Sequence, residues 1–171
     1  MGCSNIYRDT IYIVKNQNSS LDLKEPEYQA IAEFRYQIRR FLRFSEEAAR
    51  AVGLEAQQHQ LMLAVKGMPE GQDARISSLA ERLQIQHHST VELVNRLAAK
   101  GLVTKKPGVA DRREVHVQLT PRGERILRVL TAHHKRELRQ AAPALIEALR
   151  NIDAVRRRSR PRAIHRSEAS G

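Results

Sequence analysis

Residues 76–119 decide the fold, and they read ISSLAERLQIQHHSTVELVNRLAAKGLVTKKPGVADRREVHVQL. Apolar residues recur at spacings of three and four from Ile76 to Leu83 and again from Thr90 to Leu97, which predicts two short helices. The residues between them, Gln84 to Gln86, form a brief turn, and Gly101 ends the second helix. Two short helices joined by a tight turn are the pattern of a helix-turn-helix, here over residues 76–100.

After Gly101 the apolar period changes from helical to alternating. Residues 102–106 and 114–119 are strand-like, and the residues between them, 107–113, are rich in turn formers. The sequence therefore predicts a β-hairpin over residues 102–119, which is a candidate wing. Residues 100–113 carry five Lys or Arg against Asp111, so the positive charge lies on a folded segment that can face phosphates.

The flanking sequence predicts four more helices. An amphipathic stripe from Pro26 to Val52 ends at Gly53, and a second stripe runs over residues 54–68. Downstream, Thr120 is a predicted N-cap with Pro121 at the first helical position. Pro143 is expected to interrupt that helix, and a last helix follows over residues 145–152. The predicted fold is mainly α with a small β-hairpin, a winged helix-turn-helix with six helices over residues 26–152.

The two ends of the chain differ from this folded part. Residues 1–25 show no helical period and are read as a mobile arm. Residues 153–171 are read as a basic disordered tail with six Arg, a segment type that attracts polyanions without sequence preference. With 171 residues, one domain with tails is the simplest organisation.

Composition narrows the class of function. The formal net charge is +11, which indicates a polyanionic partner such as nucleic acid or an anionic membrane surface. No apolar run is long enough to span a bilayer, and no signal peptide is evident. Cys3 is the single cysteine, so we expect no disulfide framework, no multi-thiol metal site and a cytoplasmic location. We find no phosphate loop, nucleophile motif or metal-ligand spacing, and therefore expect neither enzymatic activity nor a cofactor.

Four local motifs, in this order, resemble the multiple-antibiotic-resistance regulator (MarR) family. Residues 79–83 (LAERL) with 89–97 (STVELVNRL) resemble its helix-turn-helix. Residues 100–103 (KGLV) resemble the entry to its wing, 111–113 (DRR) the wing motif, and 119–123 (LTPRG) the start of its next helix. The resemblance covers roughly residues 27–152.

This resemblance implies a sequence-specific regulator of transcription that binds double-stranded DNA at a pseudo-palindromic operator. It implies an intertwined homodimer whose first and last helices interlock, so the apolar stripes of those helices supply the dimerisation residues: Ile31, Phe34, Ile38, Leu145 and Leu149. It further implies a repressor that responds to a small lipophilic ligand. Thiol oxidation and metals are other inputs in this family, but Cys3 lies in the predicted arm without an evident activating partner.

The exposed face of the second short helix is the expected reading surface. With Thr90, Leu93 and Leu97 facing the core, the opposite face carries His88, Ser89, Glu92, Asn95 and Arg96. Gln86 and His87, at the amino end, are candidates for phosphate contacts, and His88, Ser89 and Glu92 for base edges. A solvated helix face is the alternative.

In the predicted wing, Lys105 and Lys106 suit phosphate contacts, and Arg112 or Arg113 suits a narrow minor groove, with Asp111 orienting the arginine. An exposed charged loop is the alternative. The pair His87–His88 suggests metal or pH sensing. The second pair, His133–His134, could gather with His59 and His116 in the fold, although scattered structural or surface histidines are the simpler interpretation. For the whole chain, the competing function is a nonspecific architectural nucleic-acid-binding protein, which the charge and the tail favour.

Overall fold

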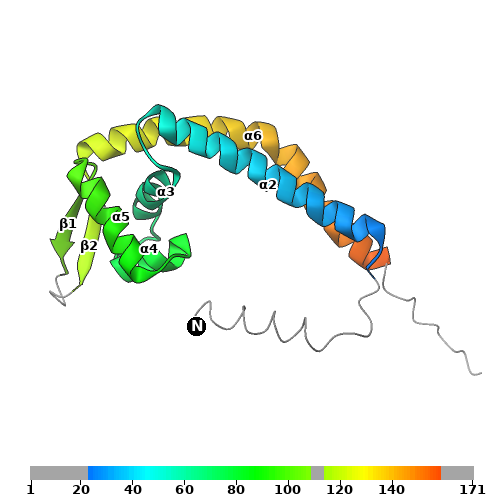
Figure 1. The fold of residues 1–171 in the computed structure, drawn as a ribbon, viewed down its shortest axis with the longest axis horizontal. Coiled ribbons are helices and arrows are strands. Elements are labelled where there is room, and N and C mark those ends of the chain that lie inside the picture. Colours follow the sequence, from blue (N-terminus) through cyan, green and yellow to red (C-terminus); the bar gives the residue numbers. More distant parts are fainter. Residues whose placement is uncertain (1–22, 109–113, 159–171) are drawn as a thin grey trace, which may run out of the picture. The chain divides into compact units, whose positions relative to one another are not determined.

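The computed structural model describes residues 23–108 and 114–158. Its elements follow in the order α2 (Glu25–Ala51), α3 (Ala56–Lys66), α4 (Ile76–Leu83), α5 (His87–Ala99), β1 (Val103–Pro107), β2 (Val115–Leu119) and α6 (Pro121–Arg158) (Figure 1). The expectation of a mainly helical fold with one small hairpin is confirmed. None of the helices in this part of the chain combines the length and the apolar character needed to cross a membrane.

The chain divides into two compact units, which we describe separately. One unit comprises residues 37–143, and the other comprises residues 1–36 together with 144–171, of which 23–36 and 144–158 are described. In the first unit, α3, α4 and α5 are grouped with the β1–β2 hairpin (Figure 1). This grouping is the winged helix-turn-helix predicted from the sequence.

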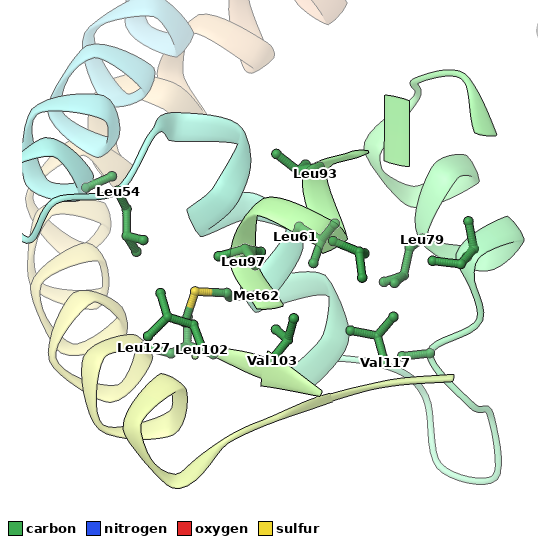
Figure 2. Packing of buried hydrophobic residues seen from close by; sticks show 14 of the residues in the cluster. Leu54, Leu61, Met62, Leu79, Leu93, Leu97, Leu102, Val103, Val117 and Leu127 are labelled. Atoms are coloured by element: carbon green, nitrogen blue, oxygen red, sulfur yellow. The ribbon is translucent and has the colours of Figure 1, made fainter. Parts of the chain in front are cut away.

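A single apolar core holds the first unit together. Leu61 and Met62 of α3, Leu79 of α4, and Leu93 and Leu97 of α5 are almost fully buried and lie in one cluster (Figure 2). Residues from the hairpin and from α6 close this cluster: Leu102, Val103, Val117, Leu127 and Leu130. Burial of this apolar surface fixes the orientation of α5 relative to its neighbours.

The helix-turn-helix follows its sequence pattern closely. Gln84 adopts a left-handed conformation and ends α4, and Gln86 is the N-cap of α5. The buried face of α5 consists of Thr90, Leu93, Val94 and Leu97, as the apolar period predicts. The hydroxyl of Thr90 donates to the Gln86 carbonyl at 3.1 Å, so this buried polar group is satisfied.

The hairpin is antiparallel, with Val103 opposite Leu119 and Pro107 opposite Val115. A further contact, which the sequence did not indicate, extends it. An isolated bridge joins Arg75 to His116, and the Val117 amide donates to the Ala74 carbonyl at 2.9 Å. The segment before α4 is therefore tied to β2.

The helix that follows the hairpin begins as predicted. The Gly123 amide donates to the Thr120 hydroxyl at 3.0 Å, which is the expected N-cap bond. The same hydroxyl donates to the Gly101 carbonyl at 2.8 Å and thus links the end of α5 to the start of α6. Gly123 is required here because a Cβ at this position would overlap the Leu102 carbonyl oxygen.

The prediction of six helices is wrong for the described residues, which form five. α6 continues through Pro143 to Arg158 as one helix of 38 residues. Proline removes one helical hydrogen bond and crowds the preceding turn, but the neighbouring alanines, Ala141, Ala142 and Ala144, are strong helix formers. The helix also includes residues 153–158, so it extends into the segment assigned to the basic tail.

The second unit is formed by the first part of α2 and the last part of α6. Ala30 and Ala148 are buried in it, with exposed fractions of 7% and 2%. Large apolar side chains elsewhere on these two segments are exposed: Tyr28, Ile31, Tyr36, Ile146 and Leu149. The apolar stripe predicted along α2 is thus only partly covered by the chain itself.

Candidate nucleic-acid interface

The amino end of α5 presents backbone and side-chain groups suited to an anion. The Gln86 side chain makes no capping hydrogen bond, and the first turn contains no acidic residue. The first N–H groups of a helix lack partners within the helix and carry the positive end of the helix dipole. Gln86 and His87 lie at this end and are exposed, as expected for residues next to a phosphate.

The outer face of α5 has the composition predicted for a reading surface. Of the five residues predicted for it, His88, Glu92, Asn95 and Arg96 are exposed, whereas Ser89 is half-buried. Imidazole, carboxylate and amide groups on one helix face can donate to and accept from base edges in a major groove.

Two of these residues already have partners within the chain. Lys105 Nζ on β1 donates to Asn95 Oδ1 at 2.8 Å, and Arg96 Nη1 donates to Glu55 Oε2 at 3.2 Å. Asn95 therefore connects α5 to the hairpin, and Arg96 connects it to the start of α3. Sequence periodicity predicts that both side chains are exposed, but it cannot detect partners this far along the chain.

Lys100, one of the basic residues predicted for the wing region, is exposed, but its amino group is hydrogen-bonded within the chain. Its Nζ donates to the Gly53 carbonyl at 2.9 Å and to Gln58 Oε1 at 3.0 Å. Arg122 also donates to the Lys100 carbonyl, at 3.1 Å. These bonds fasten the carboxyl end of α5 to the α2–α3 junction and to α6, so Lys100 orients the helix.

The wing carries exposed cations on β1. Lys105 and Lys106 are both exposed, whereas Asp111, Arg112 and Arg113 lie outside the described residues. Just before β2 begins, Arg75 Nη1 donates to Glu114 Oε1 at 2.9 Å. The His116 ring lies 3.5 Å from both Asp73 and Glu114. This cluster joins β2 to the segment before α4.

Away from this face, the first unit contains an apolar cavity of about 620 Å³. Residues of α2, α3 and α6 line it, among them Phe41, His59, Leu63, His134 and Leu138. Lys135 and Arg139 also line the cavity, and its lining contains no carboxylate. This volume lies within the ~300–1,000 Å³ range typical of small-molecule sites.

Two histidines that are distant in the sequence meet at the wall of this cavity. The rings of His59 and His134 stack with their centroids 4.6 Å apart. His134 Nδ1 donates to the Leu130 carbonyl at 2.6 Å, and its Nε2 is hydrogen-bonded to the Ser45 hydroxyl at 2.8 Å. The interpretation of the histidines as scattered is wrong for this pair, whereas His133 is exposed and His116 lies at the wing.

His59 differs from His134 because both of its ring nitrogens are buried without a hydrogen-bond partner. Its side chain is 2% exposed. Burial in apolar surroundings, and secondarily the proximity of His134, lower the pKa of His59 from 6.5 to about 4. The ring is therefore neutral near pH 7. Among the described residues, no group of three or more His, Cys, Asp or Glu is arranged to hold a metal ion.

The part of the chain that contains the helix-turn-helix matches the profile of one known protein family. The profile of the MarR family matches residues 52–114, which span α3, the helix-turn-helix and the first strand of the hairpin. None of the curated protein sequences matches the chain.

Solved structures with under 25% identity share the fold. AbsC, a MarR family transcriptional regulator from Streptomyces coelicolor, is 21% identical, with a TM-score of 0.63 over 82% of this chain and 100% of AbsC. A mutant of MarR from E. coli complexed with operator DNA is 19% identical, with a TM-score of 0.58 over 74% of this chain and 90% of that one. BpsR from Bordetella bronchiseptica, described as regulated in its DNA binding by 6-hydroxynicotinic acid, is 20% identical, with a TM-score of 0.56 over 77% of this chain and 99% of BpsR.

Proposed function

Since this chain belongs to the MarR family of winged helix-turn-helix transcriptional regulators, which are DNA-binding proteins rather than enzymes, we propose that it is a sequence-specific, ligand-responsive repressor. In this proposal it acts in the cytoplasm as a homodimer and binds a pseudo-palindromic operator. Repression follows when the bound dimer blocks access to a promoter.

The exposed outer face of α5 is the observation that carries the proposal. Its apolar side is fixed by the core, so the side chains on the other side are held in a constant arrangement. His88 and Glu92, one helical turn apart, are our candidates for base-edge contacts, with Ser89 beside them. Lys105 and Lys106 on β1 lie on the adjoining hairpin and suit phosphate contacts.

Selection of bound duplexes from a random DNA pool tests sequence specificity. We expect an enriched motif with two inverted half-sites whose centres lie about one helical turn apart, ~34–36 Å, because a symmetric dimer presents two α5 helices. A scrambled duplex should then bind about 10³-fold more weakly or worse. Equal affinity for the selected and scrambled duplexes would contradict the proposal and would instead support the nonspecific architectural function.

Variants separate base contacts from phosphate contacts. Glu92→Ala should cost ~1–3 kcal/mol of affinity for the selected duplex and relax the preference at one base pair. Lys106→Ala should lower the affinity for the selected and the scrambled duplex by similar factors, and it should reduce the dependence of affinity on salt. Gln118→Ala, on the exposed side of β2, serves as the control and should leave both affinities unchanged.

The proposed dimer is supported by uncovered apolar side chains on α2 and α6. Ile31 and Leu149 are 47% and 49% exposed, and Phe34, Ile38 and Leu145 are only half-buried. Apolar surface of this kind is typical of an obligate interface. Ile31→Glu should shift the sedimentation equilibrium mass towards that of a monomer, whereas Gln29→Glu, on the exposed polar side of α2, should not. A wild-type protein that is monomeric at micromolar concentration would refute the dimer.

The apolar cavity supports the ligand response. A ligand that binds one arrangement of the α2, α3 and α6 walls better than another shifts the population towards that arrangement. We propose that this shift changes the distance or angle between the two α5 helices of the dimer and so releases the operator. A ligand that saturates the cavity without changing operator affinity would contradict this mechanism.

A further inference from the structure

Lys100 lies at the C-cap of α5, and its ammonium group is hydrogen-bonded to two parts of the α2–α3 junction. One acceptor is the Gly53 carbonyl, at 2.9 Å, and the other is Gln58 Oε1, at 3.0 Å. Gln58 is only 1% exposed, so this bond joins a charged donor to a buried side chain. Hydrogen bonds with one charged partner are stronger than those between neutral groups. Two of the three donors of the ammonium group are thus used within the chain.

Gln58 connects Lys100 to the start of α3. Its Oε1 also accepts from the Glu55 backbone amide at 3.2 Å, as part of the capping box of that helix. The Gly53 carbonyl belongs to the turn between α2 and α3. The carboxyl end of α5 and the first turn of α3 therefore share one acceptor on a buried side chain.

These bonds restrain the direction of α5 in a way that apolar packing does not. Burial of apolar surface is non-directional, whereas a hydrogen bond depends on both distance and angle. A further bond to the junction, from Arg96 to Glu55, joins side chains that are 52% and 58% exposed, and ion pairs in water contribute little. At the amino end of α5, the Gln86 side chain makes no capping bond. The bonds of Lys100 are thus a main polar restraint on the tilt of this helix.

We propose that Lys100 is a positioning residue for sequence reading, which acts on α5 through Gln58 rather than by contact with a phosphate. Hydrogen bonds from His88 or Glu92 to base edges tolerate only small changes in distance and angle, whereas attraction to phosphates depends mainly on charge. Loss of the Lys100–Gln58 bond should therefore lower affinity for the selected duplex and leave affinity for a scrambled duplex unchanged. This inference rests on the proposed sequence-specific function.

The variant Gln58→Met separates positioning from phosphate contact, because it removes the acceptor, preserves every charge and frees the ammonium group of Lys100. Fluorescence anisotropy with both duplexes, at several salt concentrations, measures the result. If Lys100 positions α5, affinity for the selected duplex should fall about tenfold, the size of one lost base contact, with the salt dependence unchanged. If Lys100 binds phosphate, both affinities should instead rise. Gln57→Met, the same substitution at the exposed neighbouring position, is the control and should match wild type.

A double-mutant cycle tests whether Lys100 acts through Gln58. Lys100→Met should cause a similar loss for the selected duplex, and the double variant should lose no more than either single variant, because each removes the same bond. Lys100→Met should also retain the wild-type salt dependence, whereas removal of a phosphate contact lowers the slope by about 1. Circular dichroism at the assay temperature checks that each variant is folded.

Labelling of lysine amino groups tests the unaltered protein, independently of how the variants fold. The selected duplex should slow the modification of Lys106, which we propose to contact phosphate, and should leave the rate at Lys100 unchanged. Mass spectrometry of the labelled peptides distinguishes the two positions. Protection of Lys100 by DNA as strong as that of Lys106 would overturn the inference.

The binding assays can also overturn it. Contrary results are an unchanged or increased affinity of Gln58→Met for the selected duplex, equal losses for both duplexes, a reduced salt dependence of Lys100→Met, and additive losses in the double variant. A wild-type protein that binds both duplexes equally would refute the proposed sequence-specific function, and this inference with it. That result is obtained before any variant is made, so the two failures are distinguishable.

Discussion

Acidification is expected to destabilise the folded chain through the buried imidazole of His59. The pKa of this ring is about 4 in the folded chain because burial, and secondarily His134, disfavour the charged form. In the unfolded chain the ring is solvated and its pKa returns to about 6.5. Between these two values the unfolded state binds more protons than the folded state, so stability falls as pH is lowered from about 6.5 to about 4.

The size of the effect follows from the difference between the two pKa values. Each pKa unit corresponds to about 1.36 kcal/mol, so the contribution of His59 amounts to ~2 kcal/mol lost by pH 5 and ~3 kcal/mol lost by pH 4, relative to pH 7. Such a loss is a large part of the ~5–15 kcal/mol that stabilises a typical domain. It should therefore be measurable well before the chain unfolds completely.

Urea unfolding at several pH values, at fixed protein concentration, measures how the free energy of unfolding depends on the titration of His59. Other groups titrate over the same range, so the informative quantity is the difference between wild type and His59→Leu. The variant should lose ~2 kcal/mol less than wild type between pH 7 and pH 5. His133→Leu, at an exposed position, should follow the wild-type pH dependence. Equal acid sensitivity of wild type and His59→Leu would refute the reasoning.

Three further predictions concern the fold. Gly123→Ala should lower the free energy of unfolding by a few kcal/mol, because the new Cβ overlaps the Leu102 carbonyl oxygen. Gly53→Ala should lower it by only ~1–2 kcal/mol, because the Cβ has space there and only the φ of +74° is unfavourable. Thermal unfolding that shows a larger loss for Gly53→Ala than for Gly123→Ala would contradict this packing. Leu97→Ala should lower the free energy of unfolding by ~2–5 kcal/mol because this side chain is fully buried between helices, and a loss below ~1 kcal/mol would argue against the core described above. Thr120→Ala should cost ~1 kcal/mol in urea unfolding through loss of the α6 cap, and Thr120→Ser should recover most of it; equal losses in the two variants would exclude the cap as the cause.

Much of the fold could be predicted because it depends on local signals. The apolar period over residues 76–97 identifies both short helices and the buried face of α5, and the change to alternation identifies the hairpin. Thr120 and Pro121 mark the start of α6 correctly. Pro143 misled the prediction, because a proline signal is local whereas the continuation of α6 also depends on the alanines around it.

The candidate reading surface was predictable to the same extent and for the same reason. Helical geometry determines which side of α5 faces outwards once the buried side is known, so the exposure of His88 and Glu92 follows from the sequence. The hydrogen-bond partners of Asn95, Arg96 and Lys100 could not be predicted from the sequence, because each partner lies on another element.

By itself, the sequence determined the order of the elements, the side of each short helix that is buried and the position of the basic hairpin, since these depend on neighbouring residues and on backbone periodicity. Only the tertiary structure decided that His59 stacks on His134 beside an apolar cavity and that Lys100 bonds to Gly53 and Gln58. Those contacts join residues far apart in the chain. Their existence depends on how packed helices fill space, and no local pattern encodes that.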